Sequence, residues 1–240
     1  DPFSTAPVTD LDSPLEQADL GSIRAMITPD LGSAAMSHAY SSIFADRTSH
    51  FRHHFAAAID ASPDFTDGDN CFEVLRGVNF VAAHGGRVRD HRDSLSPNVV
   101  DNVDRGLAYS LADVAEAHLQ QSRIARAWLD LFEDIDVVIC PAASSTPFPH
   151  DQWSVSEIDG ETMETYMRWL GITYLPTMAL ACGIALPCGL DQAGMPFGIQ
   201  VLSAPGNDRL VAEVAKALES VLQCHDATRR PLPDLDSLRG

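Results

Sequence analysis

The sequence predicts an α/β protein in which helices alternate with short buried strands. Several segments carry apolar residues at the three- and four-residue spacing that places them on one face of a helix. Between these segments lie short, continuous apolar runs rich in β-branched residues, as expected of strands buried on both faces of a sheet. Hydrophobic residues make up 45% of the 240 residues, enough for a sizeable core. We therefore expect one α/β domain, or part of a larger one.

The first half of the chain is predicted to hold one strand and then helices. Residues 1–21 are rich in Pro, Ser and Asp and are expected to form a surface loop or linker. Ser22–Asp30 is expected to hold a short buried strand. Apolar spacing then predicts one long helix over Ser37–Asp60 and another over Phe72–Ala83, after which a pair of glycines breaks the pattern.

The next two helices begin with explicit local signals. Pro97 after Ser96 suits the first helical position and predicts a short helix that stops at Gly106. Ser110 and Asp113 have the spacing of a capping box, in which side chain and backbone bond reciprocally at a helix start. The helix that follows is predicted to present one apolar face: Leu111, Val114, Ala115, Ile124, Trp128, Leu131 and Phe132.

The second half returns to strands. Asp136–Cys140 reads as a buried strand that Pro141 ends, and a helix is predicted from Glu161 to Leu170. Two strands and a final helix complete the prediction: Ile184–Pro187, Phe197–Leu202 and a helix capped by Asn207.

Charge and composition narrow the class of partner. Sixteen Lys and Arg residues against thirty-four Asp and Glu give a formal charge of -18, which repels nucleic acids and anionic membranes. No run approaches the roughly 20 apolar residues that a membrane span needs. The first residues also lack the basic and apolar segments of a signal peptide. We therefore expect a cytoplasmic protein without nucleic-acid or membrane partners.

The cysteines do not predict a disulfide framework or a zinc ribbon, because their number is odd and no CxxC spacing occurs. We expect them to be small buried apolar residues, and Cys188, after Pro187, to be an inert thiol. The five are Cys71, Cys140, Cys182, Cys188 and Cys224.

Three histidines are spaced as if to share a helix face. His50, His53 and His54 stand at i, i+3 and i+4 of the predicted helix and are candidate ligands of a transition metal. The stretch lacks the Glu of a HExxH motif, and no nearby carboxylate completes the set. A solvated histidine cluster is the expected state, with no metal site, and a metal-dependent hydrolase is the alternative that it leaves open.

Hydroxyl side chains follow the strand that ends at Pro141. Ser144, Ser145 and Thr146 occupy a position where α/β proteins often carry catalytic hydroxyls. A serine nucleophile needs a nearby base and oxyanion donors, yet no glycine flanks these residues and His150 follows a proline-broken loop. We expect a loop that lines a pocket rather than one that carries the nucleophile.

Three stretches resemble the C-terminal half of the amidase signature family: "RDSLSPNVVDNVDRG", "ARAWLDLFEDIDVVICPAASSTPFP" and the segment from "IDGETMETYM" to "VAKALE". The likeness is clearest from Arg92 to Glu219. Within it, Pro187-Cys188-Gly189 and Gly194–Gln200 fall in the family's order and spacing. Thr177 stands where the family usually has Asn, Leu180 where it has Gly, and Cys182-Gly183 where it has Pro-Ala.

The resemblance implies the C-terminal part of an α/β/α fold, with a mixed sheet flanked by helices. It also implies hydrolysis of a small-molecule amide by acyl transfer, without a cofactor, using a serine, a bridging cis-serine and a lysine base. Those groups belong to a Gly/Ser-rich signature that this sequence lacks, and its one lysine, Lys216, lies in a different context. We therefore expect no catalytic residue within the chain, no activity of the chain alone, and a missing N-terminal catalytic portion as its partner.

If the chain is the C-terminal part of such an enzyme, we expect it to form a wall that faces the substrate, with Thr146 and Phe148 as candidate substrate-binding residues. The chain is expected to be one incomplete amidase-like unit: a linker (1–21), a weakly matched portion (22–91), a best-matched portion (92–223) and a tail (224–240). The alternative is a non-catalytic binding or scaffold module of the same fold. Formation of a homodimer is left open.

Overall fold

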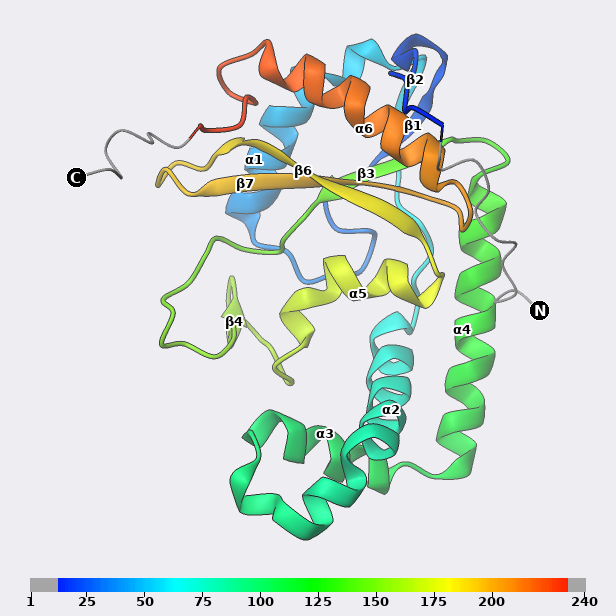
Figure 1. Cartoon of the computed structure of the whole chain (residues 1–240), viewed down its shortest axis with the longest axis vertical. Coiled ribbons are helices and arrows are strands. Elements are labelled where there is room, and N and C mark those ends of the chain that lie inside the picture. Colours follow the sequence, from blue (N-terminus) through cyan, green and yellow to red (C-terminus); the bar gives the residue numbers. More distant parts are fainter. Residues whose placement is uncertain (1–12, 233–240) are drawn as a thin grey trace.

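The computed structural model describes residues 13–232 and is built on one five-stranded sheet. Its strands are β1 (Arg24–Ile27), β2 (Ala57–Asp60), β3 (Val137–Pro141), β6 (Cys182–Leu190) and β7 (Pro196–Ser203). They lie in the order β2-β1-β3-β7-β6, with helices on both faces (Figure 1). β1 is parallel to β2 and β3, whereas β7 is antiparallel to β3 and β6. The predicted α/β class and the mixed sheet flanked by helices are confirmed.

The connection between β1 and β2 differs from the single long helix predicted over Ser37–Asp60. Helix α1 covers only His38–Ser49, and the side chain of Ser37 caps it by accepting a hydrogen bond from the Tyr40 amide. A 3₁₀ turn then leads into β2. The prediction is wrong because β2 is a short and largely exposed edge strand, so its residues show no period-two apolar pattern.

Three helices, α2 (Gly68–His91), α3 (Pro97–Ala108) and α4 (Leu111–Leu131), extend away from the sheet (Figure 1). The end of α2 predicted at the glycine pair is wrong, because the helix continues through Gly85 and Gly86. A glycine inside a helix costs about 1 kcal/mol, which the packing of α2 on α3 and α4 offsets. The capping box at the start of α4 is confirmed.

The helix predicted over Glu161–Leu170 is displaced in the structure. Glu161 belongs instead to a two-stranded hairpin formed by β4 (Glu157–Ile158) and β5 (Glu161–Thr162). Helix α5 (Gly171–Met178) follows and packs under the sheet (Figure 1). This helix is hard to predict from the sequence because it contains Gly171 and Pro176, two residue types that disfavour helices.

The chain ends in a hairpin and a helix, as predicted. β6 and β7 pair in antiparallel register, and α6 (Asp208–Gln223) covers the sheet. Asn207 occupies the N-cap position, but its amide donates a hydrogen bond to the Ser203 hydroxyl (3.0 Å) and does not cap the helix. The predicted capping role of Asn207 is therefore wrong, although the helix begins where expected.

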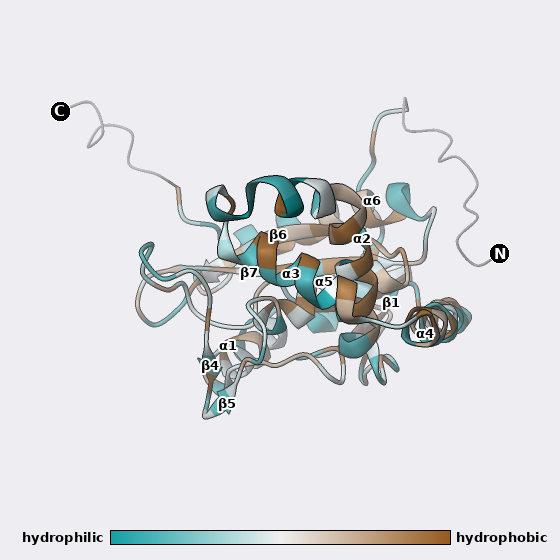
Figure 2. Ribbon diagram, turned by 90° about the horizontal axis from the view of Figure 1, so that it is seen from below, coloured by the Kyte–Doolittle hydropathy of each residue, from teal (hydrophilic) through white to brown (hydrophobic). Residues whose placement is uncertain are grey.

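The sheet separates two apolar cores. One lies between the sheet and helices α1 and α6, and the other between the sheet and helices α2, α4 and α5. Neighbouring residues of β3 alternate between them: Ile139 faces the first core, and Val138 and Cys140 the second. Figure 2 shows the hydrophobic segments concentrated at the centre of the molecule. Among residues 13–232, no helix is both long and apolar enough to cross a membrane.

The predicted linker and tail are only partly covered by the structure, because residues 1–12 and 233–240 lie outside the described residues. Of the linker, the segment from Ser13 lies along α6. There the Gln17 amide donates to the Ser220 hydroxyl and Lys216 Nζ donates to the carbonyl oxygen of Leu15, at 2.7 and 2.5 Å. This part of the linker is therefore bound to the domain.

Candidate active-site wall

One part of the sheet is left uncovered on the α5 side. In β6, Gly183, Ala185 and Pro187 are exposed, whereas Leu186 and Cys188 between and after them are buried. Gly183 pairs with Leu202, and paired residues of neighbouring strands point to the same face of a sheet. Leu202 belongs to the core between the sheet and α5, so the exposed residues of β6 lie on the α5 face. They and their β7 neighbours form what we call the β6 wall: Gly183, Ala185, Pro187, Gly198 and Gln200.

The outer edge of β6 is also open. Within residues 13–232, β6 pairs only with β7, and one side chain, Arg47, donates to its backbone, at the Leu190 carbonyl (2.8 Å). The opposite edge is better protected, because β2 is short and Arg52 donates to its Ala58 carbonyl. Natural proteins usually cover or blunt a long edge strand. The backbone of Ala227 packs closely on Gly189, so the part of the β6 edge before Gly189 is the natural place for a further element to pair.

Gln200 fixes the wall to its surroundings. Its Nε2 donates to the carbonyl oxygens of Pro141, at the end of β3, and Ile172, in α5, at 3.1 and 2.8 Å. One side chain therefore joins β7, β3 and α5 at the border of the wall. This bridging role was not anticipated from the sequence; the signal was a polar residue in an otherwise apolar strand.

The loop after β3 does not assemble a serine nucleophile. Ser144 is 1% exposed, its carbonyl accepts from the Ser37 amide (2.9 Å), and its Oγ has no hydrogen-bond partner among the described residues. The Ser145 hydroxyl donates to the neighbouring Thr146 carbonyl at 3.4 Å. His150, the candidate base, is exposed. Neither serine has the hydrogen-bonded base that activation requires.

The two candidate substrate-binding residues have different surroundings. Thr146 is exposed. Phe148 packs edge-on against Trp169, with ring centroids 5.4 Å apart, beside a small cluster that includes Val155 and Ile158. Phe148 is thus held by an apolar cluster, whereas Thr146 is presented to solvent.

Lys216 lies on the other side of the sheet from the β6 wall. It is exposed on α6, which packs on the core opposite α5, and its Nζ is bonded to the Leu15 carbonyl (2.5 Å). A lysine that acts as a base must lie within reach of the reacting groups. The position of Lys216 on α6 does not meet this requirement for a site at the β6 wall.

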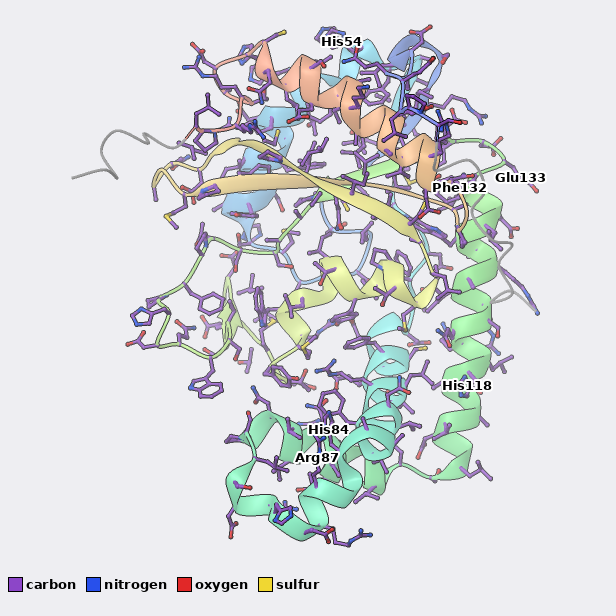
Figure 3. The ribbon with its side chains drawn as sticks, in the orientation of Figure 1. His54, His84, Arg87, His118, Phe132 and Glu133 are labelled. Atoms are coloured by element: carbon purple, nitrogen blue, oxygen red, sulfur yellow. The ribbon has the colours of Figure 1, made fainter. Side chains whose placement is uncertain are left out.

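Contrary to the prediction, His50, His53 and His54 do not share a helix face. His50 is the C-cap of α1, and His53 and His54 lie in the 3₁₀ turn that follows. The His50 ring stacks on His225, with centroids 3.8 Å apart. Figure 3 shows His54 near α6, far from His84 on α2. In the described part of the chain, no three His, Cys, Asp or Glu side chains are arranged to hold a metal ion.

Burial controls the chemistry of the cysteines, all five of which are free thiols. Desolvation raises the pKa of Cys140 and of Cys188 to about 12, and that of Cys71 and Cys182 to about 11. These thiols stay protonated at neutral pH, which suppresses nucleophilic reactivity. The expectation of buried thiols is confirmed at Cys71, Cys140 and Cys188, but Cys182 is only half-buried and Cys224 is exposed.

Comparison with solved structures places this fold among amidases. A protein described as an amidase superposes with a TM-score of 0.75 at 19% identity, over 86% of this chain and 47% of that one. A bacterial aryl acylamidase of the amidase signature enzymes gives 0.74 at 16% identity, over 85% and 44%. At these identities the likeness shows the fold.

Relatives are also found by sequence. A fatty acid amide hydrolase of Medicago truncatula is 28% identical over an alignment of 160 positions that covers 60% of this chain and 25% of that protein. An acylamidase of Rhodococcus erythropolis is 30% identical over 110 residues, which are 45% of this chain and 23% of that protein. The chain thus spans a quarter or less of the length of these relatives. The amidase family model matches residues 88–212, more than half of the sequence, so the chain belongs to the amidase family.

Proposed function

We propose that the chain forms the substrate-facing wall of an amide hydrolase whose nucleophile and base lie on a further segment. The reaction would be hydrolysis of a small carboxamide by acyl transfer to a serine. Membership of the amidase family supports the reaction class. The relatives are much longer than their match to this chain, which leaves room for the catalytic groups elsewhere.

The observation that carries this proposal is the β6 wall. Its exposed positions are occupied by small residues and by proline, whose side chains leave space for a second backbone or a ligand to approach closely. The same strand presents its open edge. A wall with an open face and an open edge suits an element that pairs with β6 and places reacting groups over the face.

The chain alone is proposed to be inactive. Amide cleavage by a serine needs a poised base and donors for the developing oxyanion. Lys216, the one lysine of the sequence, is exposed and faces away from the wall. Ser144 is buried without a base. The reactive groups would therefore come from the missing N-terminal portion, the proposed partner of this chain.

Thr146 and Phe148 are proposed to contact the substrate from the loop after β3. The carboxyl end of β3, where this loop begins, is the edge at which α/β sheets usually bind ligands. Phe148 would offer an aromatic surface fixed by Trp169, and Thr146 an exposed hydroxyl. Replacing either residue should then raise KM for the amide more than it lowers kcat.

The proposal is tested by comparing the 240-residue chain with the polypeptide encoded by the complete reading frame. Release of ammonia or amine is measured on a panel of aliphatic and aryl carboxamides. We expect hydrolysis by the complete polypeptide, none by the chain alone, and recovery when the separate N-terminal portion is added. Hydrolysis by the chain alone would contradict the proposal. A complete polypeptide that is inert on the whole panel would favour the non-catalytic binding module.

A matched pair of variants of the complete polypeptide tests the wall itself. Ala185→Trp places a large ring on the exposed face of β6 and should abolish hydrolysis. Ala83→Trp makes the same change at an exposed position of α2, away from the sheet, and should leave activity intact. Equal activity of the two variants would show that the β6 wall is not part of the active site.

A further inference from the structure

A cavity lies at the other end of the sheet from the β6 wall. It is open to solvent, has a volume of about 470 Å³ and is bounded by α1 and by the residues that end β1 and follow β2, among them Pro29 and Ser62. Both strands are parallel, so their carboxyl ends meet at this edge. Ligands of α/β proteins bind at such edges, in cavities of this size. We call it the β1–β2 cavity.

The inner side of the β1–β2 cavity is mostly apolar, and its buried polar residue, Thr48, donates its hydroxyl to the Ala45 carbonyl (3.1 Å). Ile27 from β1 and Phe44 from α1 line it and are 4% and 2% exposed. Pro29, Ala45 and Ala61 add further carbon surface. The cavity therefore favours the apolar part of a ligand, because each methylene group transferred from water contributes roughly 0.8 kcal/mol.

The mouth of the cavity carries a guanidinium with unused donors. Arg52 Nη2 donates to the Ala58 carbonyl (3.0 Å) and to Asp60 Oδ2 (2.8 Å). Within residues 13–232, Arg52 Nε and Nη1 donate no hydrogen bond. The Ser41 hydroxyl, which also lines the cavity, has no partner in the same part of the chain. These N–H and O–H groups are suited to an anionic oxygen acceptor.

We propose that the β1–β2 cavity binds a monocarboxylate with a short apolar chain. The carboxylate is held by Arg52 at the mouth, and the chain lies on Ile27 and Phe44. Asp60 competes with the ligand for the guanidinium, so it weakens binding. The proposal is independent of amide hydrolysis, because no residue of the β6 wall lines this cavity.

Three six-carbon probes of matched shape test the ligand class by titration calorimetry: hexanoate, hexanamide and hexylamine. We expect saturable binding of hexanoate, and binding of hexanamide and hexylamine weaker by about tenfold or more, the loss expected when a charged hydrogen bond is removed. Equal binding of hexanoate and hexanamide, or tighter binding of hexylamine, would overturn the proposal.

Variants then locate the site. Arg52→Gln should weaken hexanoate binding about tenfold, whereas Arg89→Gln, at an exposed arginine of α2, should not change it. Asp60→Asn should tighten binding, because it removes the competing carboxylate. A weaker affinity in Asp60→Asn, or an unchanged one in Arg52→Gln, would contradict the assignment.

A variant that fills the cavity tests the site without changing Arg52, whose hydrogen bond to β2 also supports the fold. Ala45 is exposed on α1 and lines the cavity, so Ala45→Trp can fill the space without removing a charge or a core residue. Its fold is checked by circular dichroism and thermal unfolding. Loss of hexanoate binding in the folded variant supports the site, and retention of binding excludes this cavity.

Discussion

Gly77 in α2 and Gly106 in α3 touch through their backbones. A Cβ added at Gly106 would lie 2.3 Å from the carbonyl oxygen of Gly77, and one added at Gly77 would lie 3.0 Å from the Cα of Gly106. Real Cβ atoms do not come as close as the first of these distances. The two helices can therefore pack at this separation only with glycine at position 106, and position 77 leaves little room for a side chain.

Replacing Gly106 with Ala should destabilise the fold. The added methyl group meets backbone atoms, which cannot turn aside, so α2 and α3 must separate. Overpacking of this kind costs typically about 1–3 kcal/mol. Urea unfolding followed by circular dichroism should show a lower midpoint with little change in slope.

Gly85→Ala is the matched control, because Gly85 lies in the same α2 helix. Its added Cβ would make only an ordinary contact with Val81, at 3.7 Å. Alanine is the better helix former by about 1 kcal/mol, so this variant should be more stable than the parent protein. Equal urea midpoints for Gly106→Ala and the parent would refute the close-packing argument.

The fold predictions succeeded where the signals were local. The start of α4 follows from Ser110 and Asp113, and the start of α3 from Pro97, because caps act over a single turn. β2 and α5 were missed because pairing with β1 and packing under the sheet decide their conformation. Such contacts join residues far apart in the sequence, and no local pattern reports them.

Acid should weaken the fold through Asp136, which joins the start of β3 to β1. Hydrogen bonds from the Arg24 side chain hold the pKa of the Asp136 carboxyl below its ordinary value, and the Arg24 amide also donates to it (2.7 Å). A carboxyl whose pKa is lowered in the folded state stabilises the protein above its unfolded pKa, near 3.9. That stability is lost as the pH falls through the lower, folded value.

The comparison that isolates this pair is Asp136→Asn against the parent protein, melted between pH 7 and pH 2. We expect the variant to be less stable at pH 7, and the difference in melting temperature to shrink below about pH 4. Asp90→Asn removes an exposed aspartate beside Arg89 and should follow the parent curve. A difference that persists unchanged at pH 2 would contradict the role of the ionised carboxylate.

Gln200→Leu should lower the free energy of unfolding by about 2 kcal/mol. The change leaves the carbonyl oxygens of Pro141 and Ile172 without their donor, and an unpaired buried polar group costs about 1–3 kcal/mol. Gln152 also donates to a carbonyl, that of Ser154, but in an exposed loop. Gln152→Leu should therefore change the free energy of unfolding by less than about 0.5 kcal/mol. Equal effects of the two variants would show that the hydrogen bonds of Gln200 to Pro141 and Ile172 do not stabilise the fold.

The candidate site was less predictable than the fold. Pro187 and Gln200 belong to the motif by which the sequence resembles the family, but only the paired register shows that they share one face with Ala185. The open edge of β6 depends on strand order, which the sequence does not specify. The helix predicted to carry His50, His53 and His54 is wrong for a related reason, because α1 ends at Ser49.

Thiol reactivity should separate Cys224 from the other four cysteines. Burial raises the pKa of those four to about 11 or 12, so few thiolates form at pH 8, whereas Cys224 is exposed. A disulfide reagent such as Ellman's should modify one thiol rapidly in the native protein and all five in urea. Cys224→Ser should remove the rapid phase, and Cys188→Ser should preserve it. Rapid modification of more than one native thiol would show that the cores around Cys140 and Cys188 open readily.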